Sequence, residues 1–562
     1  MIILGLNYFF HDSSACLVID GKLVVALEEE RFTRNKHTRE FPENAIEQCL
    51  KFAGIGYADI DHIAVSIKPT HMWKKKTVYA LKHLKNAAPF IKHELVGGYF
   101  KQRSFWGWYK GKFGDRAKGP NVEFVQHHLA HAAGTFLVSP YEEAAMLALD
   151  GSGEWACGWI GYGKGSDIEC YEETYFPNSL GSFYEAVTEF CGFKPNYDEG
   201  KTMGLAPMGD ASVFYDEVAK IISVDETGRV TVDLSYFQYQ FWGYHRCSEK
   251  FYATFGQPRA KDGEFEKHHM DVAAAFQKVL EEAALKIARM LKQKTGARHL
   301  VIAGGVSLNS VMNGRLLREA GFDDVYIMPA AGDNGTSIGA AFYLYNSVLK
   351  NPRVFVHDNP YVGNEYSNED IEACLKQCKL NYQQVDDITA RAAELLYEGN
   401  ILGWFQGRME IGPRALGARS ILANPAIRDM KDKINAEVKY REAYRPFAPS
   451  ATAENCKEFF DIDVEAPFML KVCAVRPDKR DVIPAVTHVD GSARLQTVRR
   501  ETNPRYHELI TKLGEKTGVS VVLNTSFNIQ GEPVVESPKD AIRCFFSTGL
   551  DYLVIGNFVV SK

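Results

Sequence analysis

The sequence predicts an α/β protein with more than one domain, and three observations lead to this prediction. The chain has 562 residues, which is too long for one hydrophobic core, so two to four domains are expected. Short apolar runs typical of strands alternate with amphipathic helical patterns along most of the chain. Glycine-containing loops follow several of these runs, as they do at the ligand-binding edge of open α/β sheets.

The composition indicates a protein of the cytoplasm. A hydrophobic content of 46% and a charged content of 24% are those of a soluble globular chain. The net charge of −6 gives no general attraction to nucleic acid or to an anionic membrane. Eleven cysteines are scattered without a paired framework, so we expect reduced thiols. No stretch approaches the ~18 apolar residues of a membrane span. We therefore expect no membrane partner.

The chain opens with an apolar run at residues 2–7, a polar turn, and a hairpin signal at Asp20-Gly21. The turn contains His11 and Asp12. Sugar kinases, actin and their relatives open with such a hairpin, whose turn faces phosphates. Residues 30–37 (ERFTRNKH) are interpreted as a basic, polar loop, residues 43–54 as a helix and residues 60–67 as a strand.

Residues 122–154 predict a metal site. His127 and His131 are four residues apart in a run of good helix formers, so both imidazoles lie on one helix face. An apolar run follows and is interpreted as a buried strand that ends at Asp150, before a turn at residues 151–153. Asp333 follows another predicted strand and becomes the fourth candidate ligand. Two imidazoles and two carboxylates suit iron, manganese or zinc without choosing among them.

Residues 68–118 carry thirteen Lys and Arg against two acids, with aromatic residues interleaved. We interpret this segment as a mostly helical, solvated insertion whose aromatic side chains pack on the body of the protein. The alternative is a surface that binds nucleic acid or an anionic small molecule.

The middle of the chain contains a strongly amphipathic helix at residues 270–296 and a strand–turn–helix pattern at residues 299–321. The turn includes Gly304 and Gly305, where the backbone can approach an anion. Together with Lys201 and Asn309, these are the nucleotide-binding candidates of the N-terminal half.

Beyond an Asn-, Pro- and Gly-rich segment at residues 351–370, the chain places cationic residues in polar loops beside apolar strands. Such an arrangement suits a polyphosphate, because arginine forks match phosphate oxygens. The residues concerned are Arg408, Arg414, Arg419, Lys439, Arg445 and Arg494.

Taken together, the motifs resemble those of the O-carbamoyltransferases of nodulation factor, cephamycin and tobramycin biosynthesis. The resemblance rests on FHDSSA, EEERFTRNKH, QHHLAHA, DGSGE, GKTMGLAP, AGGVSLN and GDNGTSIGAA, followed by GPRALGARS, REAYRPFAPS, NPRYH and LNTSFNIQGEP. It covers nearly the whole chain, and residues 68–118 and 205–265 match least.

The resemblance implies an actin-like (ASKHA), duplicated domain over residues 1–355, a linker region over 356–385 and a YrdC-like α/β domain over 386–562. The first domain would hold Fe²⁺, or another divalent transition metal, with His127, His131, Asp150 and Asp333. The second would bind ATP and carbamoyl phosphate with Lys439, Arg445, Arg494, Asn524 and Ser526, with Mg²⁺ accompanying the ATP.

The implied activity is formation of carbamoyl-adenylate, followed by carbamoyl transfer to a hydroxyl-bearing small molecule. By resemblance, Lys439 and Arg445 would stabilise charge during the first step. His11 and Asp12 would be the catalytic residues of the second step, with His11 as general base. A homodimer is compatible with this activity. Carbamoyl or threonylcarbamoyl transfer to RNA, or RNA binding through residues 68–118, are the alternatives. A metalloprotease is disfavoured, because HHLAH lacks the glutamate of H-E-x-x-H.

Overall fold

The computed structural model describes residues 1–562 except residues 70, 86 and 242–244 and the side chains of 93–95. Packing divides the chain into two compact units. Unit 1 comprises Met1–Ala26 and Arg39–His357, and unit 2 comprises Leu27–Thr38 and Asp358–Lys562. This division differs from the sequence-based boundaries, because residues 27–38 and 358–385 also pack within unit 2.

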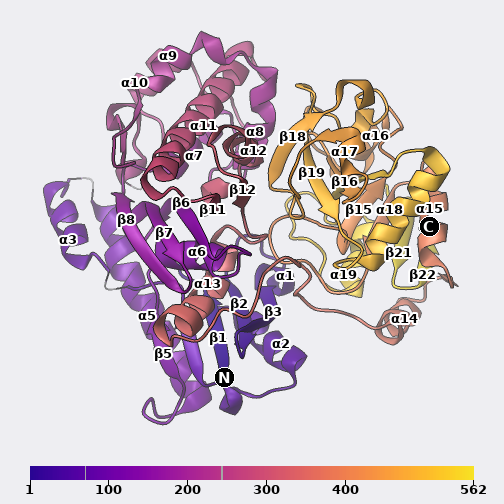
Figure 1. Ribbon diagram of the computed structural model, residues 1–562, viewed down its shortest axis with the longest axis horizontal. Coiled ribbons are helices and arrows are strands. Elements are labelled where there is room, and N and C mark those ends of the chain that lie inside the picture. Colours follow the sequence, from indigo (N-terminus) through magenta and orange to yellow (C-terminus); the bar gives the residue numbers. More distant parts are fainter. Residues whose placement is uncertain (70, 86, 242–244) are drawn as a thin grey trace. The chain divides into compact units, whose positions relative to one another are not determined.

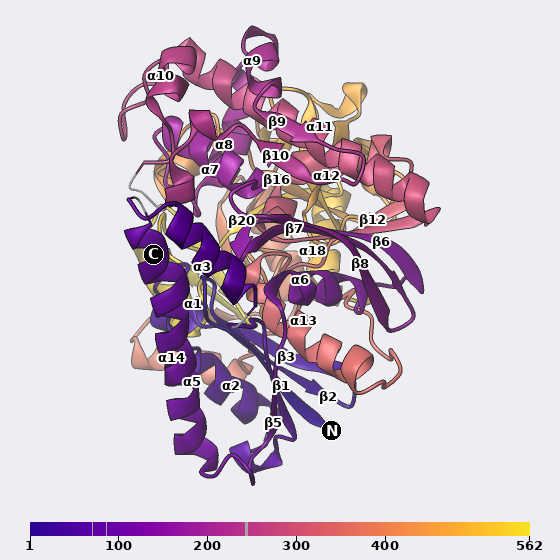
Figure 2. The ribbon, with the colours of Figure 1, turned by 90° about the vertical axis from the view of Figure 1, so that its left-hand side faces the viewer.

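Unit 1 contains two five-stranded sheets (Figures 1 and 2). The first has the order β3-β2-β1-β4-β5 and the second the order β12-β11-β6-β7-β8. The strands of the first sheet are β1 (Ile2–Asn7), β2 (Ser14–Ile19), β3 (Lys22–Glu28), β4 (His62–Val65) and β5 (Asn121–Phe124). Those of the second are β6 (Glu143–Gly153), β7 (Ala156–Lys164), β8 (Asp167–Tyr175), β11 (His299–Ala303) and β12 (Asp324–Tyr326).

The two sheets repeat one topology. In the first, β1 pairs antiparallel with β2 and parallel with β4, which continues in parallel to β5. In the second, β6 pairs antiparallel with β7 and parallel with β11, which continues in parallel to β12. The same order built twice from successive parts of the chain confirms the predicted α/β class and the duplicated, actin-like organisation of the N-terminal half.

Helices α6 (His127–Phe136) and α13 (Thr336–Phe342) lie between the two sheets (Figure 2). Helix α13 packs on the first sheet and α6 on the second. The helices can approach closely because glycines face each other, and a Cβ atom on Gly339 would lie 1.9 Å from the carbonyl oxygen of Ala130. The remaining helices of unit 1 include α2 (Glu43–Ala53), α3 (Trp73–Lys82), α5 (Gly97–Phe113), α7 (Leu180–Phe190), α8 (Glu199–Leu205), α10 (Glu249–Phe255), α11 (Lys267–Thr295) and α12 (Ser310–Glu319).

Most elements that the sequence predicted in the N-terminal half of the chain are present, and two local predictions were wrong. Residues 151–153 do not form a turn, because β6 continues to Gly153 through a shift in its register with β7. The reversal comes one step later, where Glu154 adopts a φ of 59°. The segment at residues 30–37 is not only a loop, since Glu30–Thr33 form the short helix α1.

Unit 2 is built on a ten-stranded sheet with the order β13-β22-β21-β14-β15-β20-β16-β19-β18-β17. Its strands are β13 (Gln383–Gln384), β14 (Leu402–Phe405), β15 (Arg419–Ala423), β16 (Ala448–Thr452), β17 (Phe460–Asp461), β18 (Lys471–Val475), β19 (Ser492–Val498), β20 (Val521–Ser526), β21 (Tyr552–Ile555) and β22 (Phe558–Ser561). Its main helices are α14 (Asn368–Gln377), α15 (Ile388–Tyr397), α16 (Met430–Ile434), α18 (Pro504–Thr517) and α19 (Pro538–Phe546).

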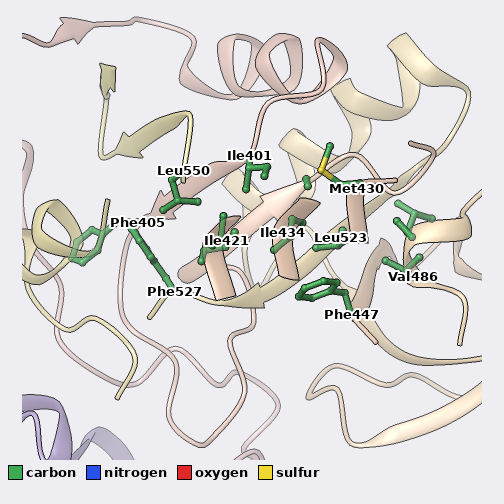
Figure 3. Close-up of a cluster of buried hydrophobic side chains, with 14 of the residues drawn as sticks. Ile401, Phe405, Ile421, Met430, Ile434, Phe447, Val486, Leu523, Phe527 and Leu550 are labelled. Carbon is green, nitrogen blue, oxygen red and sulfur yellow. The ribbon is translucent and has the colours of Figure 1, made fainter. Parts of the chain in front are cut away.

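Successive strand residues of unit 2 point to opposite faces of this sheet and build two apolar layers. On β14, Phe405 enters the cluster drawn in Figure 3 with Ile421 and Leu523. Its neighbour Trp404 enters the other layer with Leu422, under helices α15 and α18. The sheet is thus buried on both faces, which leaves its connecting loops to form a polar site.

Within the described part of the chain, no helix is long and apolar enough to cross a membrane.

Candidate functional site

The structure brings together the four residues predicted to hold a metal. His127 and His131 come from α6, Asp150 from β6 and Asp333 from the turn before α13. The Nε2 atoms of the two histidines are 3.1 Å apart, and they lie 3.4 and 3.3 Å from Oδ1 of Asp333. Oδ2 of Asp150 is 3.4 Å from Nε2 of His127. All four side chains are buried.

These separations fit a metal ion. Ligand atoms bound at about 2.1 Å to one ion lie about 3–3.5 Å from each other. Two imidazole nitrogens and two carboxylate oxygens form a mixed donor set that suits a divalent transition metal. Oδ1 of Asp333 has no hydrogen-bond partner among the described residues, although it is buried. A cation would satisfy this oxygen, so the group can hold a metal.

The electrostatics of this group are dominated by its two carboxylates. Burial favours the neutral imidazole, yet Asp333 and Asp150 together raise the pKa of His127 to about 10. Burial opposes ionisation of Asp333, but His11 and His127 hold its pKa below the usual range. Two buried acids therefore carry negative charge here and attract a cation.

His11 lies beside this group, in the turn between β1 and β2. Its Nε2 atom is 3.8 Å from Oδ2 of Asp333, and its Nδ1 atom is 2.9 Å from Oδ2 of Asp12. The side-chain amide of Asn7 donates to the carbonyl oxygens of His11 and Asp12, which fixes the turn. Burial lowers the pKa of His11, but the nearby carboxylates raise it to about 10. The predicted catalytic residue and the predicted ligands thus form one cluster.

The other candidates of unit 1 have separate roles. The backbone N–H of Gly305 donates to Oδ1 of Asp150 over 3.0 Å. Gly304 has a φ of 87°, and a Cβ atom there would lie 2.2 Å from the carbonyl oxygen of Leu149. Asn309 caps α12 by accepting from the N–H of Met312. Lys201 forms an ion pair with Asp198. Gly305 therefore supports the candidate ligand Asp150 directly and Gly304 allows close packing against Leu149, whereas Asn309 and Lys201 bond to neighbouring protein groups.

Sequence reasoning missed two residues near Asp150, at the end of β6. The Ser179 hydroxyl donates to the carbonyl oxygens of Asp150 and Gly151. Glu154 accepts from the backbone N–H of Lys68, and burial raises its pKa to about 7. The motif DGSGE contains the signal for Glu154, whereas Ser179 follows a later strand and has no recognisable pattern.

Unit 2 concentrates cations that are buried or partly buried at one site. Arg414 lies in the loop before β15, Lys439 ends a helical turn, Arg441 and Arg445 follow it, and Arg494 lies on β19. Burial, with repulsion from Arg445, lowers the pKa of Arg414 to about 10. The same two causes lower the pKa of Arg441 to about 9.

Arg494 is affected in the same way. Burial and the charges of Arg414, Arg441 and Arg445 lower the pKa of Arg494, whose Nε atom has no partner among the described residues. We name Arg414, Lys439, Arg441, Arg445 and Arg494 the cation cluster. Clustered like charges that lower one another's pKa are stabilised by a bound anion, and arginine forks match phosphate oxygens.

Lys439 joins this cluster to the loop after β20. Its Nζ atom donates to the carbonyl oxygen of Ser526, and to Oδ1 of Asn528 over 2.9 Å. The Ser526 hydroxyl donates to the same Asn528 oxygen over 2.7 Å. Lys439 and Ser526 are therefore neighbours, as predicted from the resemblance. Asn528 and Arg441 belong to the same site and were absent from the predicted set of binding residues.

Two predicted binding residues, Arg419 and Asn524, bond to groups of the protein itself. Arg419 is fully buried, and its guanidinium donates to the carbonyl oxygens of Gln406, Gly407, Ala418 and Asn364. It also stacks on Phe405, 3.7 Å from the ring centroid. The amide of Asn524 donates to the carbonyl oxygen of Ala415 and to Ser450 and Gln496. Both residues hold the loop that carries Arg414.

The segment of residues 27–38 supports the same loops. Arg31 donates to the carbonyl oxygen of Gly412 over 2.9 Å. Arg34 donates to the carbonyl oxygens of Pro533 and Val534, both over 2.7 Å. Gly412 precedes Arg414, and Pro533 follows Asn528. An early segment of the chain thus braces two loops of the cation cluster, which the sequence did not reveal.

The role of Arg419 leads to a prediction about stability. Arg419→Ala should lower the free energy of unfolding by about 3 kcal/mol, because it leaves buried carbonyl oxygens without donors. Urea unfolding followed by circular dichroism measures this change. Arg428→Ala is the matched control, since the Arg428 side chain is 70% exposed and forms an ion pair with the exposed Asp481. If Arg419→Ala leaves stability unchanged and abolishes activity, Arg419 binds the substrate and does not serve mainly to hold the loop.

Comparison with known proteins identifies the family. Residues 2–342 match the family model of the carbamoyltransferase N-terminus, and residues 393–562 match that of the carbamoyltransferase C-terminus. The chain is 39% identical to the uncharacterized protein sll1178 of Synechocystis, over 100% of this chain and 96% of that protein.

Two further relatives have names that bear on activity. Nodulation protein NolNO of Sinorhizobium fredii is 37% identical over 99% of this chain and 80% of its own length. The 3'-hydroxymethylcephem-O-carbamoyltransferase of Amycolatopsis lactamdurans is 33% identical over 65% of each chain. With both family models matched in order, this chain is an enzyme and belongs to the O-carbamoyltransferase family.

Proposed function

We propose that this enzyme is an ATP-dependent O-carbamoyltransferase that divides its chemistry between the two units. The cation cluster of unit 2 carries this proposal, because one buried and four partly buried cations gathered beside polar loops favour an anion of high charge. In unit 2, water cleaves carbamoyl phosphate to carbamate and phosphate. A carbamate oxygen then attacks the α-phosphorus of ATP, and pyrophosphate leaves, which produces carbamoyl-adenylate.

The residue types of the cation cluster suit this step. Charge spreads over the phosphate oxygens in the transition state, and fixed cations stabilise it without reorganisation. Lys439 is held by Ser526 and Asn528, and Arg414 sits on a loop that Asn524 and Arg31 fix. The site is therefore preorganised. Mg²⁺ would accompany the ATP and neutralise part of its charge.

Carbamoyl transfer is assigned to unit 1. An acceptor hydroxyl attacks the carbamoyl carbonyl carbon, and AMP leaves. His11 takes the hydroxyl proton, because it is partly exposed and oriented by Asp12. His127, His131, Asp150 and Asp333 would hold Fe²⁺ or another divalent transition metal, which supplies Lewis acidity toward the adenylate. The charge of that ion would offset the Asp333 carboxylate and so lower the pKa of His11 toward neutrality.

The names of the relatives suggest the class of acceptor. The cephem enzyme acts on a hydroxymethyl group, according to its name, and other relatives are nodulation proteins. We therefore expect a hydroxyl on a sugar or a small natural product. The cell compartment expected for this reaction is the cytoplasm, where ATP and carbamoyl phosphate are made.

The test is product analysis. Purified enzyme with ATP and carbamoyl phosphate should release pyrophosphate, and release should require carbamoyl phosphate. When a panel of hydroxylated small molecules is added, mass spectrometry should detect carbamoylated acceptor and AMP. Omission of either ATP or carbamoyl phosphate is the control. Pyrophosphate release that is independent of carbamoyl phosphate would contradict the proposed first half-reaction.

A further inference from the structure

One face of unit 1 combines exposed apolar side chains with lysines. It comprises α3 with residues 83–85, α5, and the backbone turn Ile91–Val96, which both helices contact (Figures 1 and 2). The most exposed large apolar residues here are Trp73, Leu81, Leu84, Tyr99 and Phe100, each 58–66% accessible. We call this the basic apolar face. Exposed apolar residues gathered on one surface mark an interaction site more often than single ones do.

Cations surround these apolar side chains. The exposed ones are Lys74, Lys75, Lys82, Lys85, Lys92, Arg103 and Lys110. Between residues 73 and 110 the sequence contains a single acid, Glu94. Within this segment the seven exposed cations thus have a single acid among them in sequence, so the segment carries a large excess of positive charge.

The same segment is firmly attached to the body through its other side. Phe90, Phe105 and Tyr109 are buried, and the Tyr79 hydroxyl donates to the carbonyl oxygen of Gln240. Tyr79 and Phe90 both contact the ring of Trp155. These contacts confirm the prediction of a helical insertion whose aromatic residues pack on the body. Trp73, Tyr99 and Phe100, in contrast, are exposed, although other aromatic residues of the segment are buried.

The distribution of charge over the chain is uneven. Residues 68–118 carry 13 basic and 2 acidic residues, a net charge of +11. The rest of the chain carries 65 − 13 = 52 basic and 71 − 2 = 69 acidic residues, a net charge of −17. An anionic surface would attract this one segment and repel the remainder, so it would orient the molecule. The net charge of the whole chain conceals this segregation.

The type of cation distinguishes among partners. Lysine is depleted in protein–protein interfaces, where arginine is enriched, and here eleven of the thirteen cations are lysines. Lysines around Trp, Tyr, Phe and Leu are typical of helices that lie in the interface of an anionic bilayer. Lysine stems cover apolar surface while their ammonium groups reach lipid phosphates.

From these observations we infer that the basic apolar face docks unit 1 peripherally on the surface of an anionic phospholipid bilayer. Trp73, Leu81, Leu84, Tyr99 and Phe100 enter the headgroup boundary, and the lysines bind lipid phosphates. The association is reversible and involves no membrane span. It would place the enzyme at a membrane surface, which goes beyond the proposed carbamoyl transfer and is independent of it.

The test is flotation of the full-length protein with vesicles. The protein should float with vesicles that contain phosphatidylglycerol and phosphatidylcholine, and binding should fall at least about tenfold with phosphatidylcholine alone. Raised salt should weaken binding, because surface charges are screened. Equal binding to both kinds of vesicle, or none to either, would overturn the inference.

Variants assign the binding to this face. Replacement of Lys74, Lys75, Lys82 and Lys85 by Gln should reduce flotation at least about tenfold, as each lysine contributes separately. Replacement of Leu81, Leu84 and Phe100 by Gln should also reduce it. The matched control replaces Lys164, Lys220, Lys350 and Lys376, which are 63–70% exposed elsewhere, and should float like the wild type.

Further measurements separate lipid binding from misfolding and from binding to a different partner. Circular dichroism and pyrophosphate release should be unchanged in every variant, since none touches the cation cluster or the metal group. Sedimentation velocity and a gel-shift titration with RNA test the competing occupants. If the wild type binds no vesicles and the face variants lose a dimer, the partner of this face is a second copy of the chain. If the wild type binds no vesicles and the face variants lose RNA binding, the partner is RNA.

Discussion

His127→Ala enzyme should be purified with little or no bound metal, whereas the wild type should carry about one transition-metal ion per chain. The Nε2 atom of His127 lies within 3.1–3.4 Å of the other three proposed ligand atoms, so its loss removes the centre of the group. Removal of an outer-shell partner already costs roughly 10–100-fold in metal affinity, and a direct ligand should cost more. Elemental analysis of the purified proteins measures the metal.

His245→Ala is the matched control, because His245 is a 76% exposed histidine of the same unit. It should retain the metal of the wild type. Asp333→Asn should behave like His127→Ala, since it removes the buried charge and keeps the volume. If His127→Ala and Asp333→Asn are both folded and bind as much metal as the wild type, the assignment of the metal to this group is wrong.

The sequence located the metal group because its pattern is local. Helical periodicity puts His127 and His131 on one face, and the ends of apolar strands place Asp150 and, after a loop, Asp333. Helical periodicity and strand ends can be recognised without knowing which other residues each side chain contacts. The structure brings the four together because the two sheets repeat one topology and α6 meets α13 at Gly134 and Gly339.

The sequence did not distinguish arginines that bond to the protein framework from those proposed to bind a ligand in unit 2. Arg414 and Arg419 are five residues apart in one sequence motif, yet Arg419 is fully buried and Arg414 is partly buried. Only the structure shows that the Arg419 guanidinium donates to carbonyl oxygens, whereas the positive charges of Arg414 and Arg445 repel each other. The attachment of residues 27–38 to unit 2 was equally hidden, because Arg34 bonds to carbonyl oxygens about five hundred positions away, and any loop offers such acceptors.

Mutations in the two units should separate the two half-reactions. Arg445→Ala and Lys439→Ala should reduce carbamoyl-phosphate-dependent pyrophosphate release by ~10²–10³, the usual cost of removing one donor at a developing charge. His11→Ala and His127→Ala should stop acceptor carbamoylation while pyrophosphate release continues. Carbamoyl-adenylate supplied from outside should rescue transfer in the unit 2 variants and not in the unit 1 variants. Pyrophosphate and carbamoylated acceptor are measured in the same reactions.

Stability distinguishes loss of function from loss of fold in this experiment. Arg445 helps to lower the pKa of Arg414, Arg441 and Arg494, so the ligand-free cluster is under repulsion. Arg445→Ala should therefore lose adenylation with unchanged or increased stability toward urea, because binding sites trade stability for function. Arg419→Ala should instead lower stability toward urea, because it removes hydrogen bonds of the protein framework. If His127→Ala and Arg445→Ala lost both half-reactions alike while folded, the division of chemistry between the units would be wrong.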